Sequence, residues 1–441
     1  MTPNEWLAVG MILGFFVLLT IGMPVGIGIA LAGFVFGMLG FGDFLFNLLP
    51  ARIFGVVTKY EFIAIPLFVF MGVMLERSRV AEQMLDIVGV LAGRLRGGMA
   101  MAIIIVGVLL GASTGIVGAT VVTLTLLTLP VLLRRGYSKS LACGTICASG
   151  TLGQIIPPSL VLILLADITA QSVGTLFAAA MLPGLFLAAL YCIYILGLAY
   201  LRPDVAPPLP AEERAALSGA ALVRRATWVL APPLVLIFGV LGSIIGGLAS
   251  PTEAAAVGAF LSILIAALYG RLTIGMLREV SQSTTRISAM IFFILIAAQV
   301  FSLAFRGLRG EDMVQDMFAF LPGGVTAAIV FMMVLLFILG FFLEWIEISY
   351  IALPLFLPFF ASSGVDPVWL AMLISLNLQT SFLTPPFGWA LFFLKGAAPP
   401  GITTGDIYRG AVPFIGIQLL ALAVLFFWPS LATWLPDAIG W

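Results

Sequence analysis

The sequence predicts an all-α polytopic membrane protein, and three observations support this fold class: an apolar composition, long unbroken apolar runs, and two proline pairs placed alike within such runs. Of the 441 residues, 62% are hydrophobic and 9% are charged, and the mean hydropathy is +1.21. A soluble domain has about 25% charged residues, so this chain could not cover a water-facing surface. At about 20 residues per crossing, the length allows roughly ten to twelve spans. Because the runs do not alternate, we expect helices and not barrel strands.

Composition also bears on function. The chain has no histidine, which removes the commonest general base and metal ligand, and no nucleophile–base pattern is evident, so we expect no enzymatic activity. The 20 basic and 20 acidic residues balance and give no sign of nucleic-acid binding. Residues 1–26 lack a basic segment and a cleavage site, which predicts a retained first helix. Cys143 and Cys147 lie in an apolar segment, where packing is a better explanation than a disulfide or a metal site.

The two halves of the chain resemble each other. Pro130 is followed 27 residues later by the pair that starts at Pro157, and Pro358 is followed 27 residues later by the pair that starts at Pro385. Other landmarks recur in the same order at nearly the same offset of 228 residues: Lys59 and Arg286, Arg77 and Arg306, Asp86 and Asp316, Gly97 and Gly323, Pro183 and Pro413. Duplicated halves with matching breaks are typical of secondary transporters built from inverted repeats.

This periodicity divides the chain into five parts. Residues 1–50 form N-terminal scaffold helices, 51–200 the first repeat, 201–274 a polar connecting loop with two scaffold helices, 275–430 the second repeat, and 431–441 a tail. Each repeat is predicted to contain an amphipathic surface helix that acts as an arm, then a helical hairpin, then a helix broken at its proline pair. The breaks are expected at 150–159 and 377–388.

The first hairpin is predicted from an uncharged run between Arg96 and Arg134, 37 residues long. One straight helix of this length would measure about 55 Å, against a hydrocarbon core of about 30 Å, and two full crossings would barely fit. Both flanks are basic, which places them on one side of the membrane by the positive-inside rule. A re-entrant hairpin with its tip at the glycine-rich segment 113–118 meets these constraints; two tightly packed crossings are the alternative.

The second hairpin tip is expected at 340–347, where Glu344 and Glu347 stand three residues apart in an apolar stretch. An acid within a membrane segment suggests a functional site. The alternative is that this stretch reaches the interface and both carboxylates are hydrated. Asp167 and Glu253 are expected at helix ends, the latter in the capping-box sequence SPTE that starts at Ser250.

Small and polar residues precede each break: ASGTLGQ at 148–154 and NLQTSFLT at 377–384. An interrupted helix leaves carbonyl oxygens free on one half, and these suit Na⁺ together with hydroxyl and amide oxygens. The positive N-terminal end of the next half-helix suits an anion. The alternative is a pair of kinks that serve packing alone.

Several strings identify a resemblance. GASTGIVGAT (111–120), GYSKSLACGTICASGTLGQIIPPS (136–159), SPTEAAAVGA (250–259) and LNLQTSFLTPPFGWALFFLKG (376–396) resemble the large permease subunit (M) of tripartite ATP-independent periplasmic (TRAP) transporters. The resemblance implies an elevator-type carrier in the bacterial inner membrane, with a mobile transport domain that contains both hairpins. It also implies symport with Na⁺, an organic-acid substrate delivered by a periplasmic solute-binding protein (P), and a separate small membrane subunit (Q).

The resemblance and the breaks together nominate site residues. The Na⁺ candidates are Thr114, Gly115, Gly150 and Gly153 in the first repeat, and Gly340, Glu344, Asn377, Ser381 and Thr384 in the second. The candidates for substrate contact are Ser113, Ser149, Pro157, Pro158, Ser159, Thr380, Pro385 and Pro386. One departure from the family is clear. Its SGSS-like first tip falls here on residues 114–117, so that Ile116 and Val117 replace two hydroxyl side chains and cannot ligate an ion through them.

The function expected from the sequence is therefore the permease subunit of a Na⁺-coupled, binding-protein-dependent importer of a small organic acid. One alternative is a standalone dicarboxylate carrier of the same elevator type. The other is a structural subunit of a membrane complex, although a scaffold would gain little from two interrupted helices.

Overall fold

A computed structural model describes residues 2–114, 117–209 and 219–441, and for residues 112–114 it describes the backbone alone. The described part of the chain is helical and contains no strand. The helices of the first half are α1 (Pro3–Thr20), α2 (Val25–Phe41), α3 (Phe44–Val57), η1 (Tyr60–Ile63), α4 (Ala64–Arg77), α5 (Val80–Ala92), α6 (Gly98–Thr114), α7 (Val117–Arg134), α8 (Lys139–Leu152), α9 (Leu160–Ile168), α10 (Val173–Leu201) and η2 (Pro203–Val205).

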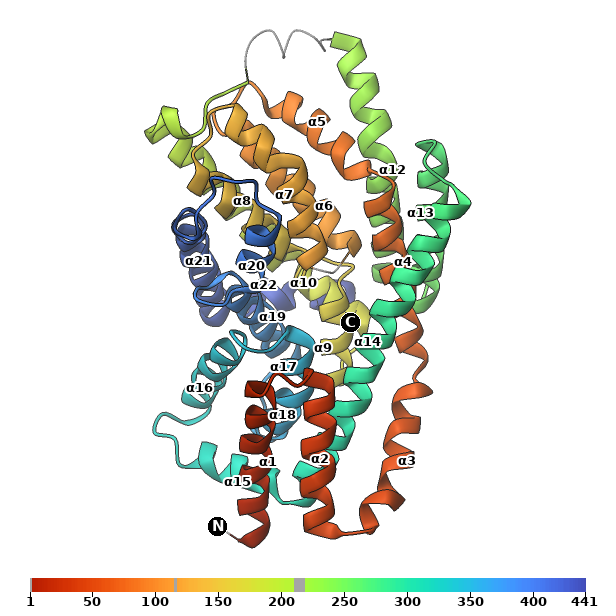
Figure 1. Ribbon diagram of the computed structural model, residues 1–441, viewed down its shortest axis with the longest axis vertical. Helices are drawn as coiled ribbons and strands as arrows, with labels where there is room; N and C mark the ends of the chain where they lie inside the picture. The colour runs from red at the N-terminus through yellow and green to blue at the C-terminus, as the bar shows by residue number, and fades with distance from the viewer. Residues whose placement is uncertain (1, 115–116, 210–218) are drawn as a thin grey trace.

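The second half is helical as well. Its helices are α12 (Gly219–Ile245), α13 (Pro251–Leu268), α14 (Ile274–Gly307), α15 (Gly310–Ala319), α16 (Gly324–Leu339), α17 (Trp345–Ile351), α18 (Leu353–Ser362), α19 (Pro367–Leu383), α20 (Trp389–Ala397), α21 (Thr404–Phe427) and α22 (Ser430–Ile439). The pair α1–α2 lies at one end of the long axis and the pair α12–α13 at the other, while α9, α17 and α19 lie near the centre (Figure 1).

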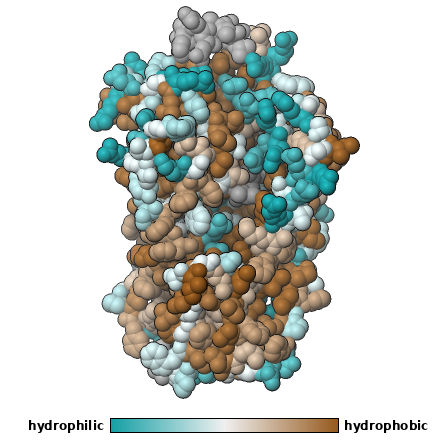
Figure 2. Space-filling model, in the orientation of Figure 1, coloured by the Kyte–Doolittle hydropathy of each residue, from teal (hydrophilic) through white to brown (hydrophobic). Residues whose placement is uncertain are grey.

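The long apolar helices make this a membrane protein, as predicted. Within the described ranges, seven helices are long and apolar enough to span a bilayer, or up to nine if each of two bent helix pairs counts as one span. Four further apolar helices are shorter, and three of them belong to the hairpins and to the broken helix α19. Figure 2 shows hydrophobic residues over the middle and lower part of the visible face, with hydrophilic residues gathered toward the upper end.

Both proline pairs interrupt a helix, as predicted, but the breaks are shorter than expected, because residues 150–152 and 377–383 are still helical. The helix α8 ends at Leu152 and α9 begins at Leu160, and the helix α19 ends at Leu383 and α20 begins at Trp389. Proline has no N–H to donate and its ring clashes with the carbonyl four residues earlier, so a proline pair disfavours a continuous helix at these positions. The bonds between the two prolines of each pair are cis.

Helix starts follow the expected capping chemistry. Ser250 and Glu253 form a reciprocal capping box at the start of α13, which confirms that prediction. Asp167 is the penultimate residue of α9, at a helix end as predicted. The short helices α5 and α15 precede the hairpins, and both follow an arginine in the left-handed conformation, Arg79 and Arg309.

Two features of the helices were not predicted. The return arm of the second hairpin is divided into α17 and α18, which meet at a bend of 52°. Pro354, in the first turn of α18, cannot donate a hydrogen bond to the carbonyl of Tyr350, which explains an interruption there. In contrast, α12 runs without a break through a third proline pair, Pro232 and Pro233.

The continuity of α12 has a local explanation. Pro232 and Pro233 leave the carbonyls of Trp228 and Val229 without their helical partners, and the hydroxyl of Tyr269 lies 3.2 Å and 3.0 Å from these two oxygens as a shared donor. Within a bilayer, every freed backbone group needs such a partner.

Tyr269→Phe is therefore expected to destabilise the protein by about 1–3 kcal/mol, the cost of leaving a sheltered acceptor unpaired. The measurement is thermal unfolding in detergent. Tyr200→Phe, at a tyrosine that is 61% exposed, is the control and should have no comparable effect. An unchanged melting temperature for Tyr269→Phe would contradict this role.

Contacts between matching positions support the predicted duplication. Ser149 donates to the carbonyl of Ile103 at 2.7 Å, and Asn377, 228 residues later, donates to the carbonyl of Met333 at 2.7 Å. The amide of Gln379 and the hydroxyl of Thr151, which occupy matching positions 228 residues apart, lie 3.5 Å from each other. The inverted relation of the two repeats and their domain boundaries remain predictions.

Candidate functional site

A cavity of about 130 Å³ lies where the hairpins and the broken helices meet. Its lining includes the start of α7 after the first tip, and Glu344, Trp345 and Ile346 at the second tip. The first residues of both half-helices, Leu160 of α9 and Trp389 of α20, also line it, and α14 supplies the opposite wall. Segments that the sequence singled out separately thus border one space, but Glu344 is the one predicted site residue among its described lining residues.

At the first break, two backbones touch. A side-chain carbon at Gly153 would overlap the backbone of Gly111, and one at Gly111 would overlap Gly153. Gly153 has φ −64°, which any residue adopts, so glycine is required here by the close approach and not by conformation. One turn earlier, a side chain at Gly150 would overlap Val121 of α7. The C-terminal part of α6 therefore lies directly on the end of α8.

The second break has the same arrangement with a different partner. A side-chain carbon at Gly340, which caps the C-terminal end of α16, would overlap the side chain of Ser381 near the end of α19. Asn377 and Ser381 are both almost fully buried, at 2% and 0% exposure. In each repeat, the C-terminal ends of two helices thus meet at a glycine.

Three hydroxyl groups near the second break each donate their proton to a backbone carbonyl in the preceding turn. Ser381 donates to the carbonyl of Leu378 at 2.7 Å, and Thr384 donates to the carbonyl of Thr380 at 2.8 Å. Thr380 itself donates to the carbonyl of Leu376 at 2.8 Å. A hydroxyl whose proton is used in this way presents only lone pairs to its surroundings. Together with the negative C-terminal ends of the helices, such oxygens can accept a cation.

The predicted substrate residues are dispersed. Ser159 is 1% exposed and donates to the carbonyl of Gln154 at 2.6 Å, within its own break. Pro157 and Pro158 are buried, whereas Pro386 is exposed and Pro385 is intermediate. Ser149 is buried against α6. Gly115 and the side chains of Ser113 and Thr114 lie outside the described residues.

Glu344 and Glu347 fix the second tip. The carboxylate of Glu347 accepts a hydrogen bond from the backbone N–H of Glu344 at 2.9 Å, and the side chain of Glu344 accepts from the backbone of Glu347 in return. This reciprocal cap starts α17. Glu347 is buried at 6% exposure, while Glu344 is less buried and lines the central cavity.

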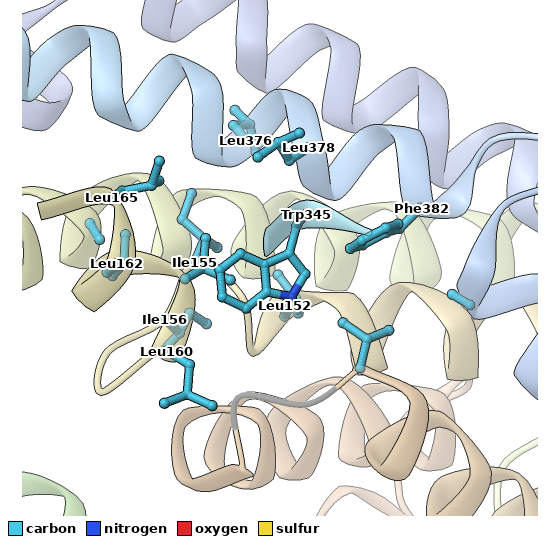
Figure 3. Packing of buried hydrophobic residues seen from close by; sticks show 14 of the residues in the cluster. Leu152, Ile155, Ile156, Leu160, Leu162, Leu165, Trp345, Leu376, Leu378 and Phe382 are labelled. Atoms are coloured by element: carbon cyan, nitrogen blue, oxygen red, sulfur yellow. The ribbon is translucent and has the colours of Figure 1, made fainter. Parts of the chain in front are cut away.

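Sequence reasoning missed the aromatic lining of the cavity. Trp345 lies between residues of the first break, among them Ile155, and Phe382 of α19 (Figure 3). Trp389 and Phe393 of α20 also line the cavity. These aromatic residues stand directly beside the tip and the break in the sequence, so their position was the available signal.

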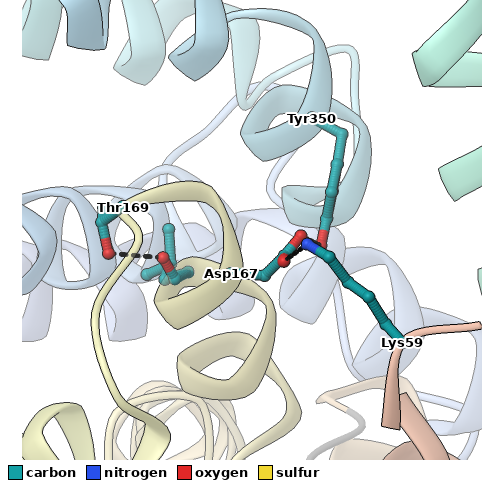
Figure 4. Close-up of polar contacts among 5 residues, drawn as sticks. Lys59, Asp167, Thr169 and Tyr350 are labelled. Atoms are coloured by element: carbon teal, nitrogen blue, oxygen red, sulfur yellow. Dashed lines mark hydrogen bonds and ion pairs between the residues drawn. The ribbon is translucent and has the colours of Figure 1, made fainter. Parts of the chain in front are cut away.

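Sequence reasoning also missed a polar contact that joins three distant segments. Asp167, at the end of α9, is paired with Lys59, which precedes η1, and accepts a hydrogen bond at 3.1 Å from the hydroxyl of Tyr350 in α17 (Figure 4). The side chain of Lys59 is 42% exposed and that of Asp167 is 13% exposed. The contact links the first half-helix to the second hairpin and to the junction of α3 and α4.

The two partners of Asp167 are expected to contribute unequally to the free energy of unfolding. Tyr350→Phe should lower the free energy of unfolding by about 1.5–3 kcal/mol, because it removes a buried hydrogen bond to a charged group. Lys59→Met should cost about 1 kcal/mol or less, because solvent screens a half-exposed ion pair. Thermal unfolding of both variants in detergent tests this order, and a larger loss for Lys59→Met would contradict it.

Comparisons with known proteins identify the family of this chain. The family model described as the DctM component of the tripartite ATP-independent periplasmic transporter matches residues 12–431. The chain is 31% identical over 397 residues to the C4-dicarboxylate TRAP transporter large permease protein DctM of Pseudomonas aeruginosa, covering 89% of this chain and 90% of the relative. It is 30% identical to the ectoine TRAP transporter large permease protein TeaC of Halomonas elongata, covering 95% and 96%.

A solved structure shares the fold. The YdaH transporter of Alcanivorax borkumensis, whose crystal structure was described as having an unusual topology, aligns with a TM-score of 0.58 and 17% identity over 90% of each chain. The family model covers nearly the whole chain, and the relatives match it over almost their full length. This multi-pass inner-membrane protein therefore belongs to the DctM family of TRAP transporter large permeases.

Proposed function

We propose that this permease imports a small organic acid by symport with Na⁺ and receives it from a periplasmic binding protein. The observation that carries the proposal is the central cavity, which is lined by the start of α7, the second hairpin tip and the first residues of both half-helices. Secondary transporters typically form their substrate and ion sites at interrupted helices of this kind.

The anion end of this proposal lies at the half-helices. The helices α9 and α20 are nine residues each, and neither N-cap, Ser159 or Gly388, makes a side-chain capping bond. Their first N–H groups and positive dipole ends suit a carboxylate in the cavity. Relatives named for C4-dicarboxylate and for ectoine, both of which carry carboxylate groups, agree with an acid as the substrate.

The cation end lies at the helix C-termini. We propose one Na⁺ site where Gly111 meets Gly153 and a second where Gly340 meets Ser381. The supporting observations are the meeting of two helix ends at each position and the acceptor-only hydroxyls of Ser381 and Thr384. Glu344 stays a candidate for the second site, although its carboxylate also caps α17.

The family defines the partners to test. A DctM component is one part of a tripartite system, so we propose a small membrane subunit and a soluble binding protein as the other two. Transport by an elevator-like movement of the hairpins and half-helices against α14 would expose the cavity to each side in turn.

The test is uptake of a radiolabelled organic acid into proteoliposomes that contain this chain with its small membrane subunit. We expect uptake only with the cognate binding protein outside and an inward Na⁺ gradient, and none when K⁺ replaces Na⁺. Uptake that persists in K⁺ would contradict Na⁺ coupling. Uptake without the binding protein would favour the standalone carrier, and the absence of uptake in every condition would favour a structural subunit.

A further inference from the structure

The lining of the central cavity distinguishes between kinds of acid, and this inference rests on the proposed function. The lining includes the aromatic side chains of Trp345, Phe382, Trp389 and Phe393. It also includes Ile287, Met290 and Ile291 of α14, which are apolar as well. A ligand enclosed here would lie against hydrocarbon and ring surfaces over most of its body.

The charged residues of the lining also limit the kind of acid that can bind. No lysine or arginine occurs among the described lining residues, and Glu344 is the one charged side chain among them. A second carboxylate on the substrate would therefore have no cationic partner and would approach Glu344, and an unpaired charge in a sheltered site is strongly disfavoured.

One anionic group, however, can be accommodated. Leu160 and Trp389 bring the N-terminal ends of α9 and α20 to the same cavity. The indole N–H of Trp389, a residue of the cavity lining, is buried without a hydrogen-bond partner in the described part of the chain. Apart from Glu344 and these helix ends, the described lining is apolar.

The size of the cavity limits the apolar part. Its volume is about 130 Å³. An apolar cavity of about 150 Å³ is known to bind one benzene molecule, so a single ring or a branched chain of similar bulk is the appropriate body. A fused ring system would exceed this volume. A sugar-like molecule would leave most of its hydroxyl groups without hydrogen-bond partners against this lining.

We propose that the substrate of this permease is a small monocarboxylate with an apolar body, either one aromatic ring or a branched aliphatic chain. The carboxylate lies at the N-terminal ends of α9 and α20, and the body packs between the aromatic side chains and α14. This assignment separates the chain from relatives that are named for C4-dicarboxylates.

The test is binding to the purified permease with its small membrane subunit, in Na⁺ and in K⁺, with three probes: phenylacetate, 4-methylpentanoate and succinate. Isothermal titration and ligand-induced thermal shift are the readouts. We expect phenylacetate and 4-methylpentanoate to bind at least about tenfold more tightly than succinate, and only in Na⁺, because burial of a ring or branched chain is worth more than this factor.

Two neighbouring residues provide a matched pair of variants. Phe393→Ala removes lining surface and should weaken phenylacetate binding about tenfold while leaving the weaker succinate binding unchanged. Phe392→Ala alters the adjacent residue, which is 71% exposed and is not among the lining residues, and should leave both unchanged. Equal effects of the two variants would mean that the ring does not bind here.

The outcomes separate the two proposals. Na⁺-dependent binding of succinate in preference to phenylacetate would overturn the substrate class while the proposed Na⁺-coupled permease stands. Binding of all three acids without any dependence on Na⁺ would contradict the proposed coupling but leave the preference measurable. No binding of any probe in Na⁺ would overturn both.

Discussion

Gly153→Ala is expected to abolish transport and to destabilise the protein by about 1–3 kcal/mol or more, the usual cost of overpacking. The added carbon would overlap the backbone of Gly111, and a backbone cannot move aside as the end of a flexible side chain can. Since the backbone angles at Gly153 suit alanine, the effect would come from separation of α6 from α8 alone. Uptake in proteoliposomes and thermal unfolding in detergent measure the two effects.

The control for this variant is Gly197→Ala in the long helix α10. Apart from the backbone of its own helix and its chain neighbours, no atom lies within 4 Å of the position that its new side chain would take, and alanine favours a helix over glycine. The control should retain uptake with equal or slightly higher stability. If Gly153→Ala retained transport as the control does, the close approach of α6 and α8 would not be required.

Ser381→Ala is expected to raise the Na⁺ concentration for half-maximal uptake by about tenfold to a hundredfold. The hydroxyl proton of Ser381 is engaged by the carbonyl of Leu378, so its lone pairs are available to a cation. Removing one of the oxygen atoms that coordinate Na⁺ should weaken Na⁺ binding by about 1.5–3 kcal/mol, by analogy with hydrogen bonds to charged groups. Each 1.4 kcal/mol corresponds to a factor of ten in affinity.

Ser375→Ala is the matched control because it makes the same change in the same helix. The hydroxyl of Ser375 is buried and has no hydrogen-bond partner in the described residues, so its removal should be neutral or slightly stabilising. Stability in Na⁺-free buffer should be alike for both variants, and the Na⁺ dependence should differ. An identical Na⁺ dependence in Ser381→Ala and Ser375→Ala would remove Ser381 from the ion site.

Local chemistry made the helix breaks and the tips predictable from the sequence. Pro157–Pro158 and Pro385–Pro386 interrupt helices because proline removes a backbone hydrogen bond and clashes with the carbonyl four residues earlier. The equal spacing of the two pairs from a preceding proline indicated that the two breaks correspond. The capping box at Ser250 is equally local. The same rule would have predicted a break at Pro232–Pro233, where α12 is continuous. Tyr269, far along the chain, supplies the donor that the rule cannot anticipate.

The remaining features depend on contacts between distant residues. Lys59 and Asp167 are separated by 108 positions, and no periodicity in the chain indicates that they meet. The wall that α14 gives to the cavity depends in the same way on how the halves pack. For the aromatic lining, the residue types and their places beside the tip and the break were visible, but their orientation toward one space was not.

The contact between Thr151 and Gln379 has a consequence for the origin of the fold. In a symmetric homodimer, the interface is isologous, and a residue on the two-fold axis meets its own copy in the partner. Matching residues 228 positions apart meet here within one chain. If the halves arose by gene duplication, the centre of this permease is the subunit interface of an ancestral dimer.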